Sequence, residues 1–509
     1  MKSNSTKAVP KRWLGLAVLT LPVLLTSMDI SILHLAIPAI TEDLAPSTGQ
    51  MLWILDVYGF LLAGLLILMG GLGDRVGRRR LLLIGAVVFG AASVLAAFAD
   101  SPEWLIAARA LMGIGGATLM PSTLSLIRTM FDDPTERSRA IAVWTAALAG
   151  GVALGPIIGG VLLQYFPWGS VFLINVPVIL LLLAAAPLLI PEYRHATPSP
   201  LDPLSVALSF LAILPIVWAV KTGAEELAVT AGMLIAIAVG ILAGIVFLRR
   251  QGRLTTPLVD VSLFANRRFT GSVLAGALAM FSLVGLTLYL SQHLQLVLDF
   301  SPLTAALWML PITAGIAAAA ITTSALAARV GPGPIFGVAA GLAATGMIVV
   351  SLTPADGGLA QIIVGAVLAA TGISPITTLA TDVVVATAPP SQSGSASALA
   401  ETANELGAAF GIAVLGSLGS LVYRAEVVAE LPAGLGGELE QILGSSLGAA
   451  LGVLNTMPTE MAAPLMELVR EAFVEGLAAA TLAGGVVLGV LAVLVSLLLR
   501  GQRPTGQTE

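Results

Sequence analysis

The sequence contains no cysteine, which excludes disulfide bonds, thiolate metal sites and cysteine nucleophiles. Charged residues make up only 10% of the 509 residues, too few polar side chains to cover a water-soluble globule. ATP hydrolysis by this chain has no basis either, because no Gly-x-x-x-x-Gly-Lys-Ser/Thr loop occurs. Hydrophobic residues account for 57%, and the mean hydropathy is +0.97. The composition therefore predicts an all-α polytopic membrane protein.

A bilayer-spanning helix needs roughly 20 apolar residues, and about fourteen runs of the sequence meet this condition. They lie near 12–38, 50–72, 80–99, 103–127, 138–164, 168–190, 201–220, 227–248, 269–297, 302–328, 334–352, 358–387, 393–423 and 472–499. Breaks rich in proline and charge predict an N-terminal six-helix bundle (1–190), a two-helix insertion (191–267) and a C-terminal six-helix bundle (268–509). An alternative with twelve spans treats 201–248 as two re-entrant segments. Two six-span halves are typical of transporters with a substrate site at the midplane.

Basic residues orient the predicted spans, because short cytoplasmic loops carry an excess of Lys and Arg. With both termini in the cytoplasm, only Lys221, Arg424 and Arg470 fall outside, and Arg109 falls within a span. The segment 424–470 is then an extracytoplasmic loop, whose Leu/Ala periodicity near 438–454 indicates short amphipathic helices. The net charge of -5 gives no reason to expect a nucleic-acid partner.

Two acidic residues fall inside the first two spans. An ionised Asp29 at the bilayer centre would cost about 3 kcal/mol, so it lines a polar cavity, is protonated, or is satisfied by a neighbouring helix. Asp56 shares a helical face with Trp53 and Phe60, and Tyr58 is nearby in the sequence. A carboxylate flanked by aromatic rings can receive a lipophilic cation, although aromatic residues near a span end can also be interface anchors.

Four further charged residues are candidates for coupling or binding. Arg109 needs a buried acidic or carbonyl partner, which makes it part of a structural ion pair or of a proton relay. Glu401 and Glu405 lie four residues apart on one helical face of the thirteenth span, where two close carboxylates cannot both ionise easily. They are candidates for a second-half proton or cation site, or for an inner-vestibule surface. Asp382, near the end of its span, is a weaker candidate.

Glycine recurs in two segments that require close approach of the backbone. The cationic turn after the second span contains Gly70, Asp74, Arg75, Gly77 and Arg78. The fifth span contains Gly151, Gly155, Pro156 and Gly159. Glycine at every fourth position permits close helix contact, and proline permits bending. The three histidines have no metal-ligand spacing, so we predict no metal site.

Together these segments resemble the major facilitator superfamily. Gly70-x-Leu72-Gly73-Asp74-Arg75-x-Gly77-Arg78-Arg79 is similar to its signature between helices two and three, and Leu105-x-x-x-Arg109-x-x-x-Gly113-x-Gly115 to its fourth-helix motif. Gly151-x-x-x-Gly155-Pro156-x-x-Gly159-Gly160 resembles the fifth-helix antiporter motif, which indicates exchange rather than uptake. The segments Met28–Pro38 and Phe172–Pro177 resemble motifs of the fourteen-helix drug:proton antiporter family, in its quaternary-ammonium and multidrug branch.

The resemblance implies a bacterial inner-membrane antiporter that expels lipophilic organic cations in exchange for protons. It implies no cofactor, since the proton gradient drives transport, and a monomer in the lipid bilayer. The loop around Asp74 would be a conformational latch, Arg109 would belong to the proton relay, and the carboxylates of the first, second and thirteenth spans would bind substrate or protons. One departure is Trp168-Gly169-Ser170, where many relatives have Trp-Arg-Trp.

Two other functions stay open at this point. An exporter of one endogenous metabolite or lipid would share the same fold and proton coupling. A transport-dead sensor or scaffold is disfavoured, because the buried acids and glycine signatures are intact and no soluble signalling domain is attached.

Overall fold

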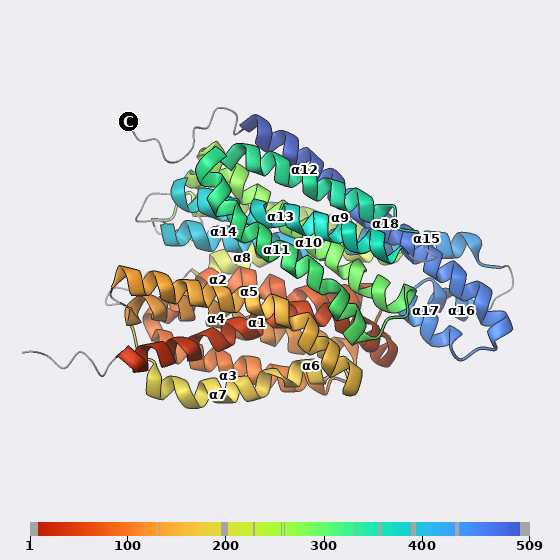
Figure 1. Ribbon diagram of the computed structural model, residues 1–509, viewed down its shortest axis with the longest axis horizontal. Coiled ribbons are helices and arrows are strands. Elements are labelled where there is room, and N and C mark those ends of the chain that lie inside the picture. The colour runs from red at the N-terminus through yellow and green to blue at the C-terminus, as the bar shows by residue number, and fades with distance from the viewer. Residues whose placement is uncertain are drawn as a thin grey trace, which may run out of the picture. The chain divides into compact units, whose positions relative to one another are not determined.

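The protein is helical throughout the part that the structure describes, and no β-strand occurs there (Figure 1). This computed structural model describes residues 9–131, 133–194, 202–226, 230–255, 257–258, 260–330, 332–354, 358–387, 393–432 and 437–498. Within these ranges, 14 helices are long and apolar enough to cross a membrane. Helices satisfy every backbone hydrogen bond internally, which is the condition for crossing lipid. The predicted fold class and span number are confirmed.

Contacts between residues divide the chain into two compact units. Unit 1 comprises Met1–Ala36 and Val57–Val206, and unit 2 comprises Ile37–Asp56 and Ala207–Glu509. The helices up to the first break are α1 (Val9–Leu44), α2 (Thr48–Val76), α3 (Arg78–Ala97), α4 (Pro102–Met130), α5 (Pro134–Tyr165), α6 (Ser170–Leu173) and α7 (Asn175–Leu189). The six-two-six domain boundaries stay a prediction.

The remaining helices follow in chain order. They are α8 (Pro203–Glu226), α9 (Ala231–Gln251), the short η1 (Val261–Ala265), α10 (Arg267–Gln292), η2 (His293–Val297), α11 (Pro302–Val330), α12 (Pro332–Ser351), α13 (Leu359–Thr387), α14 (Ser393–Gly411), η4 (Ile412–Gly416), α15 (Ser417–Glu430), α16 (Gly437–Leu443), α17 (Leu447–Leu454) and α18 (Thr459–Leu498). The segments η2 and η4 are π-helical turns that continue α10 and α14.

The inserted pair, α8 and α9, consists of two continuous helices of 24 and 21 residues. This length fits two complete spans and not two re-entrant segments. Only 22% and 17% of their spanning windows are buried, against 61% for α4. Their largely exposed surfaces are apolar, as expected for helices that face lipid.

The predicted loop 424–470 is itself mostly helical. Two short helices, α16 and α17, occupy the segment where the Leu/Ala periodicity predicted them, and they lie together beside the start of α18 (Figure 1). The last predicted span began near residue 472, but α18 begins at Thr459. Residues 460–471 are mostly good helix formers, so the helix extends beyond the apolar stretch on which the prediction depended.

Glycine sets the separation of several helices in unit 2. A Cβ atom at Gly346 on α12 would lie 2.6 Å from the carbonyl oxygen of Gly365 on α13. Gly407 and Gly411 on α14 lie in the same way against backbone carbonyls of α10. Since lipid supplies no hydrophobic drive for helix association, such close backbone approach is a main source of packing energy.

We expect Gly346→Ala to destabilise the protein by about 1–3 kcal/mol, because the added methyl group must push two helix backbones apart. Gly341 on the same helix is the matched control, since no described atom lies within 4 Å of a Cβ built there. Gly341→Ala should leave thermal unfolding in detergent unchanged or raise its midpoint slightly. Equal unfolding midpoints for the two variants would contradict the packing described for α12 and α13.

Candidate functional site

A buried ion pair occupies the interior of unit 1. Arg109 on α4 donates to the carboxylate of Asp29 on α1, and the two residues are only 1% and 4% exposed. The guanidinium carbon of Arg109 also lies 4.7 Å from the ring centre of Tyr58 on α2, a cation–π contact. Three helices therefore meet at one charged group, and the acidic partner that Arg109 requires is Asp29.

The glycines of the fourth-helix motif explain why Arg109 can lie this close to Tyr58. A Cβ atom at Gly113 would lie 2.8 Å from the backbone oxygen of Tyr58, and one at Gly115 would lie 2.8 Å from the backbone nitrogen of Phe89 on α3. Glycine at both positions lets α4 approach α2 on one side and α3 on the other. The glycines of this motif thus allow the short distance between α4 and α2 at which Arg109 contacts the Tyr58 ring.

The fifth-helix glycines lie against α1, at the level of Asp29 but on a different side of the helix. Gly151 and Gly155 lie beside the hydroxyl groups of Ser27 and Ser31, and Gly159 lies beside Ile32. Both serine hydroxyls donate to carbonyls of their own helix, at 2.9 Å for Ser27 to Val23 and 3.0 Å for Ser31 to Met28. The serine hydroxyls at the α1–α5 contact are therefore both hydrogen-bonded within α1. Pro156 is buried within α5.

Asp56 is also buried, at 1% exposure, on α2. Asp56 and Trp53 belong to unit 2, whereas Tyr58 and Phe60 belong to unit 1, so the unit boundary falls within this helix. Trp53 is half-buried and Phe60 is 2% exposed. All four side chains project from one continuous helix, as the sequence predicted.

The three acidic residues predicted for the second half lie on two helices. Glu401 and Glu405 are half-buried on α14, one turn apart, and Asp382 is exposed near the end of α13. The α14 face that packs on α10 carries Ala400 and Asn404. Each glutamate follows one of these residues, so both carboxylates are turned about 100° away from that packed face.

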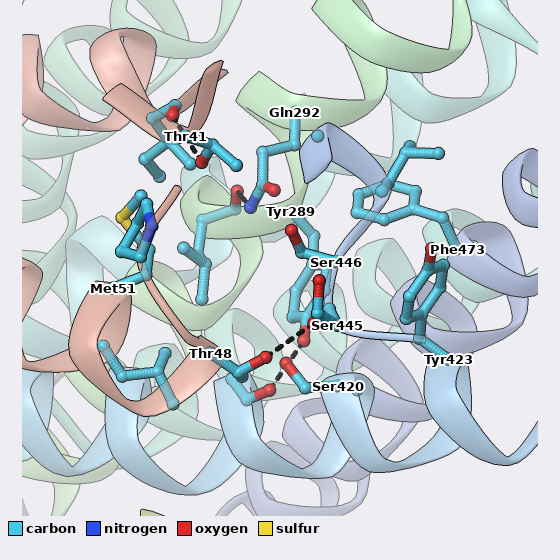
Figure 2. Close-up of a pocket in the computed structure, with 18 of the residues that line it drawn as sticks. Thr41, Thr48, Met51, Tyr289, Gln292, Ser420, Tyr423, Ser445, Ser446 and Phe473 are labelled. Carbon is cyan, nitrogen blue, oxygen red and sulfur yellow. Dashed lines mark hydrogen bonds between the residues drawn. The ribbon is translucent and has the colours of Figure 1, made fainter. Parts of the chain in front are cut away.

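Unit 2 also contains a pocket that none of the predicted site residues lines (Figure 2). It lies between the end of α1, the start of α2, α10, α15, the α16–α17 connection and α18. Its walls carry hydroxyl and amide groups from residues such as Thr48, Gln292 and Ser446. Sequence reasoning missed these residues, because serine and threonine near helix ends are common as caps.

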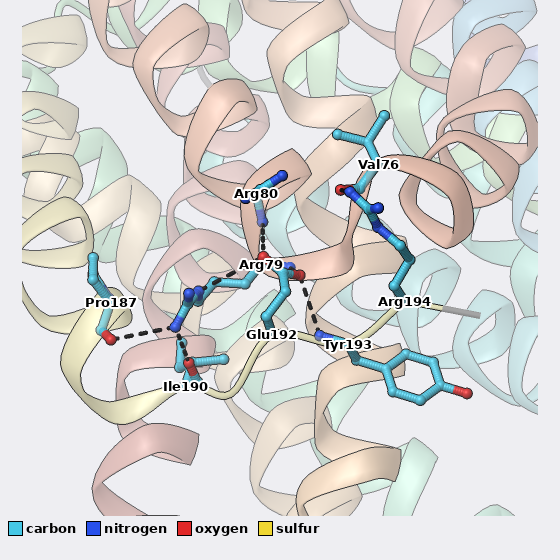
Figure 3. Close-up of polar contacts among 8 residues, drawn as sticks. All are labelled: Val76, Arg79, Arg80, Pro187, Ile190, Glu192, Tyr193 and Arg194. Atoms are coloured by element: carbon cyan, nitrogen blue, oxygen red, sulfur yellow. Dashed lines mark hydrogen bonds and ion pairs between the residues drawn. The ribbon is translucent and has the colours of Figure 1, made fainter. Parts of the chain in front are cut away.

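The turn between α2 and α3 is fixed by an arginine cluster (Figure 3). Asp74 accepts from Arg78, with an Nη2–Oδ1 distance of 2.6 Å, and Arg75 is exposed. Gly77 has a φ of 114°, a conformation that glycine adopts without strain. Arg79 donates to the carbonyl oxygens of Pro187 and Ile190, 3.3 and 2.9 Å away, at the end of α7.

Glu192, which sequence analysis did not single out, caps this arrangement. Its carboxylate accepts from the backbone N–H groups of Arg79 at 3.0 Å and Arg80 at 3.2 Å, the first turn of α3 (Figure 3). A carboxylate there satisfies otherwise unpaired N–H groups and complements the helix dipole. Arg194 donates to the Val76 carbonyl at 2.9 Å, so the segment after α7 is joined to both sides of the turn.

Gly169 explains the departure from the Trp-Arg-Trp pattern. It lies against the backbone carbonyl of Ala97 at the end of α3, where a side chain would overlap the oxygen. Trp168 packs edge-on against Phe172 beside it. Among the described residues, no group of three His, Asp or Glu side chains is placed to hold a metal ion.

Comparison with known proteins identifies the fold and its relatives. Residues 19–412 match the pattern of the Major Facilitator Superfamily. The chain is 45% identical to the multidrug efflux pump LfrA of Mycolicibacterium smegmatis, over 96% of this chain and 97% of the relative. It is 34% identical to the methyl viologen resistance protein SmvA of Salmonella typhimurium, over 95% and 97%. It is also 32% identical to a tetracenomycin C resistance and export protein of Streptomyces glaucescens, over 97% and 92%.

Solved structures show the same fold at low sequence identity. A bacterial homologue of the lysosomal transporter Spinster, inward-facing and unoccupied, superposes with a TM-score of 0.70 at 18% identity, covering 96% of this chain and 98% of that one. A peptide transporter in complex with sulfate gives a TM-score of 0.61 at 16% identity, covering 96% of each chain.

We expect Asp29→Asn to cost about 3–5 kcal/mol of stability, because it leaves Arg109 charged, buried and without its carboxylate partner. The matched control is Asp299→Asn, which removes an Asp–Arg pair at the surface, where Asp299 is 68% exposed beside Arg470. A surface pair is worth about 0–1 kcal/mol, so this control should unfold like the wild type. The double variant Asp29→Asn/Arg109→Gln should regain part of the loss in thermal unfolding. If the double variant is as unstable as the single one, the pair is not the cause.

Gly77→Ala should destabilise the turn by about 1–3 kcal/mol, because the residue has a positive φ and a Cβ atom would lie 2.6 Å from the Glu192 carboxylate. Gly70→Ala tests the same motif without this clash, since no described atom lies within 4 Å of a Cβ there. Thermal unfolding and transport rate should both fall for the first variant and stay near wild type for the second. Tolerance of alanine at both positions would refute the role given to Glu192.

Proposed function

Because this chain belongs to the major facilitator superfamily and is a multi-pass drug efflux transporter, we propose that it exports lipophilic organic cations in exchange for protons. The observation that carries the proposal is the buried Asp29–Arg109 pair under Tyr58. A carboxylate inside a membrane protein is a default site for protons or cations. The name of SmvA refers to resistance to methyl viologen, a dication with two quaternary nitrogens, which is the substrate class that we propose.

The residues divide into two roles in this proposal. Asp29 and Arg109 would carry the proton step, because protonation of Asp29 removes the charge that holds Arg109. Asp56 would receive the cation with Trp53 and Phe60, on the same helical face, as aromatic neighbours. Glu401, Glu405 and Asp382 would supply the carboxylates of the second half.

The turn around Asp74 and Arg78 would act as the conformational latch, with the glycine contact between α1 and α5 as the surface on which these helices move. We place both termini and this turn in the cytoplasm and the helices α16 and α17 outside, in the bacterial inner membrane, with the protein as a monomer. Moving one charge is worth about 2.3 kcal/mol per 100 mV, so exchange of one proton for one monovalent cation would use the pH gradient alone.

Export of a single endogenous product is the second candidate function. It is favoured by relatives named for a product, such as the tetracenomycin C export protein and a probable actinorhodin transporter of Streptomyces coelicolor, which is 33% identical over 91% of this chain. Neutral products would not need Asp56, so the two functions differ in their demand for that carboxylate.

The test is collapse of a pH gradient in energised inverted vesicles on addition of ethidium. Wild type should collapse the gradient, and Asp56→Asn should reduce the ethidium-dependent rate at least about tenfold, because the cation loses its counter-charge. Asp29→Asn should abolish exchange of every substrate, with the amount of folded protein measured in the same membranes. Asp299→Asn should behave as wild type.

Three outcomes would redirect the proposal. Collapse by wild type and by both site variants would remove Asp29 and Asp56 from the mechanism. No collapse by wild type with a broad panel of cations would favour the product exporter. Loss of transport of neutral substrates in Asp56→Asn would move this residue from cation binding to proton coupling.

A further inference from the structure

The pocket of unit 2 is polar without being charged. The residues that line it include no Asp, Glu, Lys or Arg. Its polar groups are hydroxyls and one amide, and its apolar wall contains Tyr289 and Phe473, whose ring centres are 5.8 Å apart (Figure 2). A cation entering this space would lose hydration without gaining a counter-charge, which is costly. The lining therefore favours an uncharged ligand.

Some of the polar groups hold the walls together. The Thr48 hydroxyl donates to the Ser445 carbonyl at 2.6 Å and joins the start of α2 to the α16–α17 connection. The Tyr423 hydroxyl donates to the Leu443 carbonyl at 2.6 Å, and the Tyr289 hydroxyl donates to the Gly416 carbonyl at 2.9 Å. The first two bonds attach the α16–α17 segment to α2 and α15, and the third joins α10 to η4, so the pocket has a formed outer wall.

Other polar groups keep hydrogen-bonding capacity toward the space. Gln292 uses its amide nitrogen to donate to the Leu288 carbonyl at 3.1 Å, and no described residue donates to its Oε1 atom. Ser446 accepts from the Ala449 backbone at 3.3 Å as the cap of α17, which leaves its O–H as a donor. Thr48 retains acceptor lone pairs while it donates to Ser445. The lining thus offers both donors and acceptors in addition to the rings of Tyr289 and Phe473.

We propose that this pocket binds neutral, hydroxylated polycyclic drugs through the Gln292 amide, the Ser446 hydroxyl and the Tyr289–Phe473 wall. The proposed function and the proposed orientation of the protein in the membrane place this pocket on the exit side, and this part of the inference rests on them. The protein would then have a neutral binding site in addition to the carboxylates that receive cations.

The test uses 1,8-dihydroxyanthraquinone as the neutral probe and ethidium as the cationic one. Binding of each to the full-length protein in nanodiscs is measured by quenching of tryptophan fluorescence. Gln292→Leu should weaken binding of the anthraquinone about fivefold, the loss expected for one net hydrogen bond, and should change ethidium binding less than about twofold. Equal weakening of both probes, or of neither, would overturn the proposal.

Gln295→Leu is the matched control. Gln295 lies on the π-helical continuation of the same helix and also donates its amide nitrogen to its own backbone, at 3.2 Å to the Ser291 carbonyl, but it does not line the pocket. This variant should bind both probes like the wild type. An equal loss of anthraquinone binding in Gln295→Leu would assign the effect to distortion of the helix and refute the site.

A second measurement does not depend on the leucine variants. Because the chain has no cysteine, Ser420→Cys places one thiol in the pocket wall, and Ser351→Cys places one outside it. The anthraquinone should slow labelling of the Ser420→Cys variant by a methanethiosulfonate reagent, and ethidium should not, with neither probe affecting the Ser351→Cys control. Absence of protection in the Ser420→Cys variant would overturn the site. Both binding tests use no proton gradient, so failure of ethidium exchange in vesicles would refute the proposed function and leave the pocket to be judged separately.

Discussion

Close contact between helix backbones, made possible by glycine, is the constraint on which this structure depends. In lipid, burying apolar side chains between helices gains no hydrophobic free energy. The helices therefore associate through close packing of small residues and a few polar bonds. On α4, Gly113 and Gly115 bring the backbone against α2 and α3, and this approach puts Arg109 4.7 Å from the Tyr58 ring. The same principle places α5 against Ser27 and Ser31 of α1. The charged site is therefore a consequence of the packing glycines around it.

Charges that lie inside such a bundle need partners from other helices. Asp29 and Arg109 satisfy each other across α1 and α4, so neither must be compensated by water. At the turn between α2 and α3, Glu192 performs a similar task for backbone groups, since it accepts from the first N–H groups of α3. In both cases an acid distant in sequence completes a group that its own helix leaves unsatisfied.

The sequence predicted the elements better than their pairings. Hydropathy was sufficient for all fourteen spans, because it depends on local composition. The cost of a buried Arg109 predicted that a partner exists, but several acids were available, and only packing selects Asp29. Glu192 could not be found, because a single acid in a charged break resembles an ordinary surface residue. The pocket residues were also hidden, since Ser446 has an obvious local role as a helix cap.

The geometry of the buried pair also bears on how the carboxylates divide their tasks. A lipophilic cation that bound Asp29 would have to displace a guanidinium that already touches both the carboxylate and the Tyr58 ring. A quaternary nitrogen cannot donate hydrogen bonds, so it would replace a charge-assisted hydrogen bond with a weaker contact. A proton suffers no such disadvantage, because it binds the oxygen covalently and removes the charge. Within the proposed function, this comparison favours protons at Asp29 and leaves cation binding to another carboxylate. Asp56 is a candidate, because it is buried and its spacing puts it on one helical face with Trp53 and Phe60.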